Sequence, residues 1–449
     1  MVANGVEGRI LPDEVHERLA EHMLVDGYSI VLDLAKSHGS RLVDARDSTE
    51  YLDFYTFFGS SPLGLNPPGL ADDPSTMGEL AEAAVNKPAN SDLATVHLAE
   101  FVTTFARVLG DPEMPHLFFV EGGALAVENA LKCAFDWKSR HNEAAGRSPA
   151  LGTQVLHLRH AFHGRSGYTL SLTNTDPVKV DRFPKFDWPR ISSPAARFPL
   201  DAYRTEVEAA EVVALAEAEA AFEAYPHDIA CFVAEPIQCE GGDRHLRAEF
   251  LLAAQQLCYR HDALFVLDEV QTGAGATGTP WCYQQLGLAP DVVAFGKKVQ
   301  LGGIMAGRRV LEVDANVFRT PGRINSTWGG NLTDMVRSRR LLQLVEQTGA
   351  IANAATVGCH LLRRLEEIAA DWPDAASNAR GRGFIAAIDL ASGKLRDTTL
   401  MRLRQEEHVL ALACGERSLR VRPALSMTAE EVDLGCDALH RVLGRLAGA

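Results

Sequence analysis

The sequence predicts an α/β protein with a mostly parallel sheet that helices cover on both faces. From about Pro115, short apolar runs alternate with longer segments of helical periodicity. Strands of a parallel sheet are buried on both faces, so they appear as continuous apolar runs, and each needs a crossover to reach the next. This repeated β-α-β pattern therefore predicts the α/β class. The 449 residues, 46% of them hydrophobic, suffice for a large buried core.

The individual elements follow in chain order. The opening part has a helix-like start at Asp13–Leu24, and a turn-rich tetrapeptide predicts a hairpin of Arg41–Ala45 with Tyr51–Phe58. The strands expected in the sheet are Leu117–Val120, Val155–Leu158, Ile229–Ala234, Ala263–Asp268, Val292–Phe295 and Ile304–Gly307. The helices expected around them are Gly123 to about Arg140, a surface helix at Leu200–Tyr225, and Glu249–His261.

A smaller α+β part is expected after about Thr333, where the composition changes again. Its predicted elements are helices at Met335–Gln347 and Asn353–Ala370, strands at Gly383–Leu390 and Ser418–Val421, and a last helix from Glu430. We therefore expect residues 1–75 to contribute to a small domain, residues 76–330 to form a large α/β domain, and residues 331–449 to form the C-terminal α+β domain.

Charge and composition exclude several classes of protein. Acidic residues outnumber basic ones by 59 to 44, a net charge of −15, which argues against nucleic-acid binding and against docking on an anionic membrane. No apolar stretch approaches the ~18 residues of a spanning helix, and the first thirty residues do not resemble a secretory signal. The eight cysteines form no CxxC pair. We expect a cytoplasmic protein with reduced thiols.

Three strings resemble sites of other proteins but lack a required part. Leu264–Glu269 matches a Walker B strand, but no GxxxxGK[ST] loop accompanies it. Gly273–Gly278 reads GxGxxG, but a proline and a tryptophan follow where a dinucleotide site needs a helix, so a glycine-rich turn is favoured. An HxxHxxH string is formed by His157, His160 and His163. On a strand that leads into a loop, this spacing does not place the three rings on one face, and we therefore expect no metal site.

Three other features, each at a different strand end, share one chemistry. Asp268 ends an apolar strand, where open α/β sheets bind ligands; the alternative is a core acid held by backbone donors. Lys297 follows another buried strand, where burial would lower the pKa of its amine and favour Schiff-base formation. For Lys298, a surface lysine is the better interpretation. Glu121–Ala124 lies where a strand turns into a helix and suits a phosphate. Together these describe a pyridoxal-phosphate site.

The same residues and several further strings resemble the class-III aminotransferases, which are pyridoxal-phosphate enzymes of fold type I. The resemblance covers nearly the whole chain, and it implies a large cofactor-binding domain with a mostly parallel sheet and a smaller α+β domain. The matching strings are Ala234–Gln238, Asp268–Gly273, Pro290–Lys297, Glu128–Lys132, Phe162–Arg165 and Arg420–Pro423. Phe119–Lys132, Phe183–Arg190 and Asn325–Asn331 further resemble the members that act on the ε-amine of lysine.

The resemblance implies a role for each residue around the cofactor ring. Lys297 would hold the cofactor covalently and then move the proton at the substrate carbon. Asp268 would pair with the protonated pyridine nitrogen, and Gln271 would hydrogen-bond the phenolic oxygen. Phe162 would stack on the face of the ring.

The cofactor phosphate is expected at the backbone of Gly123 and Ala124. The resemblance adds Thr327, which would reach the phosphate from a second subunit. The expected unit is therefore a homodimer with shared active sites.

The substrate residues implied by the resemblance are Arg165, Glu240, Arg420 and Asn325. Arg165 would hold the distal carboxylate of either substrate, and Arg420 the α-carboxylate of 2-oxoglutarate, because a guanidinium binds a carboxylate with two hydrogen bonds. Glu240 would pair with Arg420 when lysine is bound and swing away for the oxo acid. Cys239 stands where these enzymes usually carry glycine, which puts the freedom of this switch in question.

The expected reaction is transfer of the ε-amino group of L-lysine to 2-oxoglutarate. It would give L-glutamate and 2-aminoadipate 6-semialdehyde, which cyclises to piperideine-6-carboxylate. Ornithine, 4-aminobutyrate or another ω-amine is the alternative donor. A non-catalytic binding protein with the same fold is the alternative from another class.

Overall fold

The computed structural model describes residues 10–447, and its central feature is a seven-stranded sheet in the order β3-β11-β10-β9-β6-β4-β5. Neighbouring strands are parallel except where β11 pairs with β3 and with β10. The strands are β3 (His116–Val120), β4 (Gln154–Leu158), β5 (Arg190–Ile191), β6 (Ile229–Ala234), β9 (Leu264–Asp268), β10 (Val292–Phe295) and β11 (Gly302–Ala306).

Helices surround this sheet and build most of the rest of the chain. They are α1 (Val15–Ala20), α2 (Thr56–Gly59), α3 (Pro74–Val85), α4 (Val96–Val108), α5 (Gly123–Ala144), α6 (Gly167–Leu172), α7 (Leu200–Ala224), α8 (Ala248–Arg260), α9 (Cys282–Gln285), α10 (Leu332–Gln347), α11 (Ala350–Asp371), α12 (Gly393–Glu406) and α13 (Ala429–Ala447). Short 3-10 turns are η1 (Pro12–Glu14), η2 (Pro177–Lys179), η3 (Lys297–Val299) and η4 (Arg308–Glu312). No helix within residues 10–447 has the length and apolar character needed to cross a membrane.

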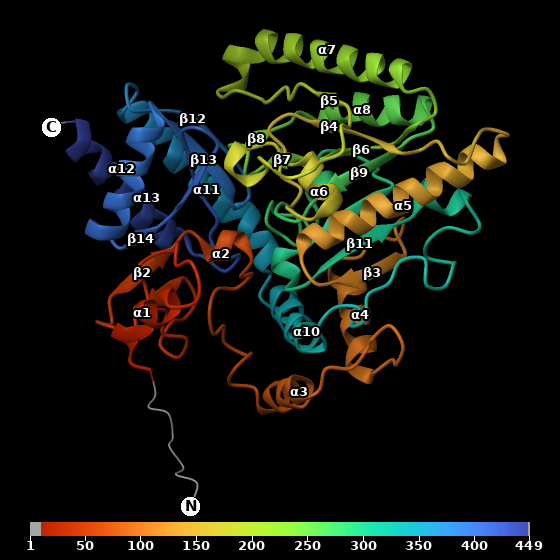
Figure 1. Ribbon diagram of the computed structural model, residues 1–449. Coiled ribbons are helices and arrows are strands. Elements are labelled where there is room, and N and C mark those ends of the chain that lie inside the picture. The colour runs from red at the N-terminus through yellow and green to blue at the C-terminus, as the bar shows by residue number, and fades with distance from the viewer. Residues whose placement is uncertain (1–9, 448–449) are drawn as a thin grey trace, which may run out of the picture.

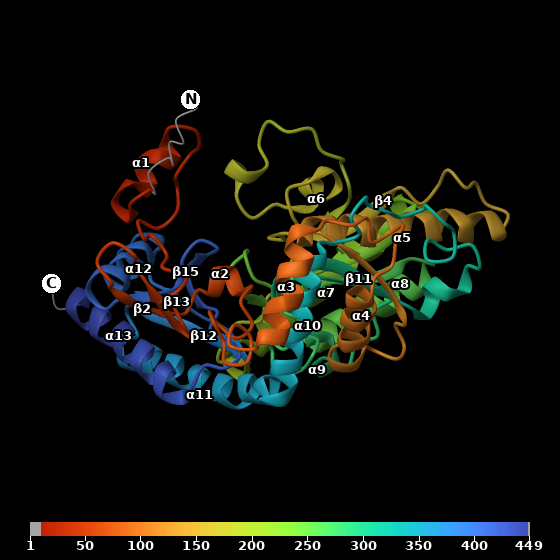
Figure 2. The ribbon, with the colours of Figure 1, turned by 90° about the horizontal axis from the view of Figure 1, so that it is seen from below.

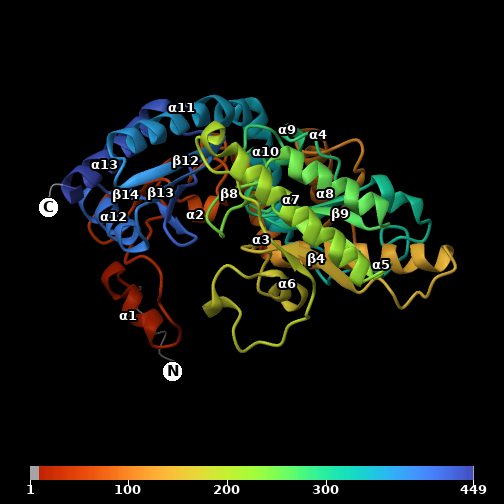
Figure 3. The same ribbon diagram turned by 90° about the horizontal axis from the view of Figure 1, so that it is seen from above.

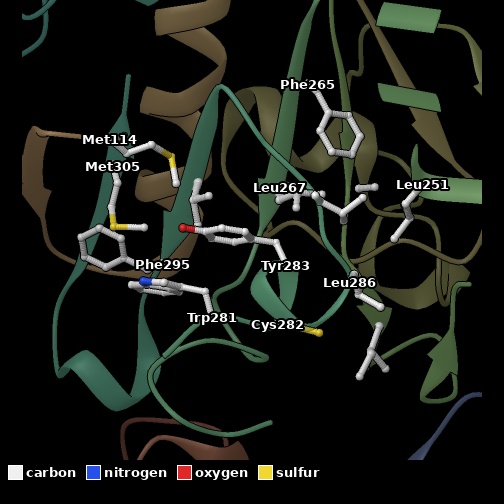
Figure 4. Close-up of a cluster of buried hydrophobic side chains, with 14 of the residues drawn as sticks. Met114, Leu251, Phe265, Leu267, Trp281, Cys282, Tyr283, Leu286, Phe295 and Met305 are labelled. Carbon is white, nitrogen blue, oxygen red and sulfur yellow. The ribbon is translucent and has the colours of Figure 1, made fainter. Parts of the chain in front are cut away.

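Side chains of the large sheet alternate between two separate cores. In β9, Leu264 and Val266 belong to the core that α5 covers, whereas Phe265 and Leu267 belong to the core on the opposite face. Figure 3 shows α5 on one side of the sheet and α7 and α8 on the other. Figure 4 shows part of the second core, to which Phe265, Leu267, Trp281 and Phe295 contribute, with Trp281 beside Phe295. Both faces are thus sealed, and only the strand ends remain open for a site.

Smaller sheets form the other end of the molecule. One has the order β12-β13-β16-β15, and another has the order β1-β2-β14, in which β14 pairs in parallel with β2. Figures 1 and 2 show the early strand β2 beside the late helices α12 and α13. These strands are β1 (Arg41–Val43), β2 (Glu50–Asp53), β12 (Ala376–Arg382), β13 (Ile385–Leu390), β14 (Val409–Leu410), β15 (Leu412–Cys414) and β16 (Ser418–Val421), and a separate pair is β7 (Ile237–Gln238) with β8 (Arg244–His245).

The structure confirms each strand predicted for the large sheet and the later helices to within a few residues. The N-terminal helix is shorter than expected and ends at Ala20, and the second hairpin strand ends at Asp53 rather than Phe58. The strand cannot extend to Phe58, because Phe57 and Phe58 take positive φ angles of 54° and 60°. The helices α3, α4 and α12 were not predicted from the sequence.

Candidate active site

A cavity of about 450 Å³ opens at the carboxyl ends of β9 and β10, the edge where open α/β sheets bind ligands. It brings together nine of the residues that the sequence singled out, from six separate segments of the chain. They are Gly123, Ala124, Phe162, Arg165, Glu240, Asp268, Gln271, Lys297 and Arg420.

Lys297 is half-buried in an unusual backbone position just after β10. Its φ angle is 48°, in the left-handed region that residues with a Cβ rarely adopt, and the turn η3 begins at this residue. Burial lowers the pKa of its ammonium group, and the positive charge of Arg420 lowers it further. Lys297 is therefore closer to the neutral amine than a surface lysine is, which favours nucleophilic attack on a carbonyl.

Asp268 is oriented by a histidine that the sequence interpretation did not assign to the site. The Oδ2 atom of Asp268 lies 2.8 Å from Nδ1 of His163, and both side chains are buried. An ionised carboxylate can only accept, so His163 donates from Nδ1. The second oxygen, Oδ1, accepts from the backbone N–H of Val270 at 3.0 Å. The carboxylate is thus fixed at the bottom of the cavity, where it can meet a protonated ring nitrogen.

Glu235 joins two segments of the cavity wall. Its Oε1 accepts from the backbone N–H of Phe162 at 2.9 Å, and its Oε2 accepts from the backbone N–H of Cys239 at 3.3 Å. Burial raises the pKa of Glu235 well above its usual range, and the nearby carboxylate of Asp268 raises it further. The aromatic ring and the loop before Glu240 are therefore tied to one buried acid.

Gln271 presents a hydrogen-bond donor to the cavity because its oxygen is already occupied. The Nε atom of Arg422 donates to Oε1 of Gln271 at 2.8 Å. Arg422 is itself held by a fully buried ion pair with Asp243, with Nη1 and Oδ2 2.9 Å apart. Since a guanidinium only donates, the amide NH₂ of Gln271 is left for the cavity. That donor suits a phenolic oxygen.

The N-terminus of α5 forms an anion cradle at the cavity. A Cβ atom added at Gly123 would lie 2.7 Å from Cγ1 of Val270, so only glycine fits this close approach. No side chain caps this helix end, so its first backbone N–H groups are available to an anion. Small residues and free donors together fit a phosphate.

Glu240 lies between two cations on the cavity wall. Its Oε2 accepts from Nη2 of Arg420 at 2.6 Å, and its Oε1 lies 2.5 Å from Nζ of Lys179. Burial alone would raise the pKa of Glu240, but Arg420 and Lys179 outweigh it and lower that pKa to about 2. Arg420 is buried, and its Nε and Nη1 have no partner within residues 10–447. The sequence interpretation did not include Lys179.

Arg165 lies at the exposed rim of the same cavity. Its guanidinium carbon is 5.9 Å from the ring centre of Phe162. It makes no ion pair with any acid within the described residues, so its charge is available to an anionic ligand.

Three other predicted positions lie elsewhere. The interpretation of Lys298 as a surface lysine is wrong: it is buried, and its Nζ donates to the backbone oxygen of Gly59 at 2.6 Å. Burial, with Arg422 and Lys297 nearby, lowers the pKa of Lys298 to about 7. Asn325 and Thr327 are exposed on the loop before α10 and do not line the cavity of their own chain.

The strings that resembled other sites are occupied by internal contacts. Glu269 is buried and accepts from the backbone N–H groups of Cys282 and Tyr283, both at 2.8 Å. His157 is buried on β4 and accepts from Nε of Arg190 at 2.9 Å. These contacts stabilise the fold and leave neither side chain for a nucleotide or a metal ion.

The described residues therefore offer a matching group for each part of pyridoxal phosphate. A primary amine at Lys297 suits the aldehyde, and a fixed carboxylate at Asp268 suits the ring nitrogen. The donor of Gln271 suits the phenolic oxygen, and the cradle at Gly123 suits the phosphate.

Comparison with known proteins agrees with this geometry. The family model described as aminotransferase class-III matches residues 24–443. An L-lysine-epsilon aminotransferase of Mycobacterium tuberculosis is 59% identical over 432 residues, 96% of each chain, and one of Amycolatopsis lactamdurans is 57% identical over 95% of this chain and 94% of its own. A solved lysine aminotransferase from M. tuberculosis has a TM-score of 0.96 at 58% identity, covering 97% of this chain and 100% of its own. A probable 4-aminobutyrate aminotransferase of Caenorhabditis elegans is 32% identical over 96% of this chain and 90% of its own.

Proposed function

Since this chain belongs to the class-III aminotransferases, whose cofactor is pyridoxal phosphate, we propose that it transfers the ε-amino group of L-lysine to 2-oxoglutarate. The products would be L-glutamate and 2-aminoadipate 6-semialdehyde, which cyclises to piperideine-6-carboxylate. High identity to curated L-lysine-epsilon aminotransferases over nearly the whole chain supports this choice of donor.

The single observation that carries the proposal is the ion pair between Glu240 and Arg420 in the cavity of Lys297. One cavity must accept lysine, which presents an amine to the cofactor, and 2-oxoglutarate, which presents a carboxylate there. With Glu240 in place, the charge of Arg420 is neutralised and an amine can approach. With Glu240 moved aside, Arg420 can bind a carboxylate through its guanidinium.

The residues around the ring serve proton transfer. The bound cofactor supplies an electron-withdrawing ring that stabilises negative charge on the carbon next to the substrate nitrogen. Lys297, whose lowered pKa favours the neutral amine, would take the proton from that carbon and deliver it to C4′ of the cofactor. Asp268, oriented by His163, would keep the ring nitrogen protonated, and Gln271, whose oxygen is held by Arg422, would donate to the phenolic oxygen. Phe162 would stack on the ring, and the backbone at Gly123 and Ala124 would hold the phosphate, since all three residues line the cavity.

The far end of the substrate is assigned to Arg165, which would bind the carboxylate that both substrates carry there. Its rim position and lack of an acidic partner within residues 10–447 support this role. We assign Asn325 and Thr327 to the active site of a second copy, Asn325 toward substrate and Thr327 toward the phosphate. Their exposure outside their own cavity supports a homodimer with shared sites.

The domain division and the cellular location are also proposals. We propose that residues 1–75 contribute to the small domain that residues 331–449 form beside a large domain of residues 76–330. Residues 1–9 and 448–449 lie outside the described residues, and the pairing of β2 with β14 supports the division. All eight cysteines carry free thiols, which supports a cytoplasmic location, and the net charge of −15 supports the absence of nucleic-acid and membrane partners.

Steady-state kinetics with L-lysine, L-ornithine and 4-aminobutyrate, each with 2-oxoglutarate, tests the choice of donor. We expect the highest kcat/KM with lysine. A higher value with ornithine or 4-aminobutyrate would reject lysine and keep the family. The Lys297→Ala variant, purified with cofactor, is the control for background turnover, and absence of turnover with all three donors would favour the non-catalytic alternative.

A further inference from the structure

Glu240 forms part of the wall between two cavities. The active-site cavity lies on one side, and a polar cavity of about 790 Å³ lies on the other. Arg420 lines the first cavity and not the second, Lys179 lines the second and not the first, and among residues 10–447 Glu240 alone lines both. The two cations that hold this carboxylate therefore stand on opposite sides of the wall.

Each oxygen of Glu240 has its own cation. Arg420 donates to Oε2 at 2.6 Å, and Lys179 lies 2.5 Å from Oε1. Lys179 has a side-chain exposure of only 15% and pairs with no other acid within residues 10–447. Its turn, η2, is stabilised by Asp176, whose side chain accepts from the backbone N–H of Val178. Within residues 10–447, Glu240 is therefore the one acid that pairs with Lys179, whose Nζ also lies 5.5 Å from the ring centre of Phe162.

The backbone around Glu240 is held too firmly for the loop to move as a unit. Cys239 is fully buried, and its N–H donates to Glu235. On the other side, a Cβ added at Gly241 would lie 2.1 Å from the backbone oxygen of His160, so the chain there is in close contact with its neighbour. The switch that transamination needs must therefore be a rotation of the Glu240 side chain alone.

We infer that Lys179 receives the carboxylate of Glu240 when a dicarboxylate binds Arg420, and so sets the affinity for 2-oxoglutarate. This inference rests on the proposed function. An ionised carboxylate displaced from Arg420 needs another charged partner, because leaving it partly buried and unpaired is unfavourable. Lys179 already bonds one oxygen and lies outside the active-site cavity. Rotation toward it keeps Glu240 paired and frees Arg420 for the substrate.

The test compares Lys179→Met with Lys179→Arg and with Lys185→Met, a matched control. Lys185 is an exposed lysine of the same segment that donates to a backbone oxygen and pairs with no acid in the part of the chain that the structure describes. Each holoenzyme is measured in its two half-reactions by absorption, and its affinity for glutarate, a dicarboxylate that does not react, is measured by calorimetry.

We expect Lys179→Met to weaken the binding of 2-oxoglutarate and of glutarate by roughly tenfold, which is the effect of losing one charge-assisted hydrogen bond. The lysine half-reaction should stay within about twofold, because Glu240 remains on Arg420. Lys179→Arg should restore most of the affinity, and Lys185→Met should resemble the parent protein. If Lys179→Met slowed both half-reactions equally, its role would be merely structural and the inference would be overturned. Unchanged affinity for the dicarboxylates in this variant would overturn it as well.

The Glu240→Gln variant distinguishes two roles of Lys179, binding the displaced Glu240 carboxylate or binding the dicarboxylate substrate directly. In Glu240→Gln, Lys179 has no carboxylate to receive, so adding Lys179→Met should leave glutarate affinity within about twofold. A tenfold loss in that background would show that Lys179 binds the dicarboxylate itself, and the inference would fail. If the parent enzyme does not react with lysine but the glutarate affinities change as expected, lysine is rejected as the donor and the role of Lys179 is retained.

Discussion

Replacing Glu240 by glutamine should move the Michaelis constants of the two substrates in opposite directions. The pKa of Glu240 is lowered from 4.5 to about 2, which corresponds to roughly 3 kcal/mol in favour of the charged form. The side chain is 27% exposed, and two cations share this interaction. We assign about half of this free energy to Arg420. Freeing Arg420 from Glu240 should therefore raise the affinity for a dicarboxylate about tenfold.

Glu240→Gln removes the competitor for Arg420, so the KM for 2-oxoglutarate should fall by roughly tenfold. The KM for lysine should rise by a similar factor, because the uncovered charge of Arg420 then repels an incoming ammonium group. Both constants come from steady-state kinetics at varied concentrations of the two substrates. Glu416→Gln, an exposed acid lining only the neighbouring polar cavity, is the control. Shifts in the same direction would refute the reasoning.

Three further variants test the surroundings of the site. His163→Phe removes the donor that orients Asp268, so kcat should fall roughly tenfold to hundredfold while the cofactor stays bound, measured by kinetics and absorption. Arg422→Met leaves Asp243 buried without its partner and should lower the free energy of unfolding by about 3–5 kcal/mol in urea. Lys298 has a pKa of about 7 when folded and an ordinary value of 10.5, so the unfolded chain binds more protons between these pH values and stability rises with pH. This rise should be about 2 kcal/mol from pH 7 to 9, and Lys298→Met should lose it in urea unfolding.

Each of these variants has an outcome that would contradict its premise. An unchanged kcat in His163→Phe would mean that the hydrogen bond does not orient Asp268. Arg422→Met combined with Asp243→Leu should regain part of the lost stability, and a further loss would argue against an unpaired buried charge as the cause. A parent protein whose stability does not rise from pH 7 to 9 relative to Lys298→Met would contradict the lowered pKa of Lys298.

The residues at the strand ends could be predicted because local sequence marks them. Asp268 and Lys297 each follow a continuous apolar run, and buried parallel strands have that appearance. Strands β9 and β10 pair directly, with Ala294 opposite Asp268, so the two strand ends meet at one edge. Gly123 could be found in the same way, since it begins a helix after a strand.

Other parts of the site depend on contacts between residues far apart in the sequence, which no local sequence pattern predicts. Lys179 is 61 residues before Glu240, and His163 is 105 residues before Asp268. The burial of Lys298 could not be predicted because the left-handed φ of Lys297 ends the strand alternation there, and Lys298 is buried while Lys297 lines the cavity. The helices α3 and α4 were missed because no motif drew attention to that stretch of the chain.

The visible absorption spectrum of the holoenzyme, recorded before and after addition of L-lysine without an oxo acid, tests the central claim most directly. We predict a yellow band that bleaches with lysine and returns when 2-oxoglutarate is added, because each half-reaction uses the same cavity. A band that ignores lysine but bleaches with ornithine or 4-aminobutyrate would contradict the proposed donor. A protein that stays colourless with added pyridoxal phosphate would contradict the assignment of Lys297, Asp268 and Gly123 to a cofactor site.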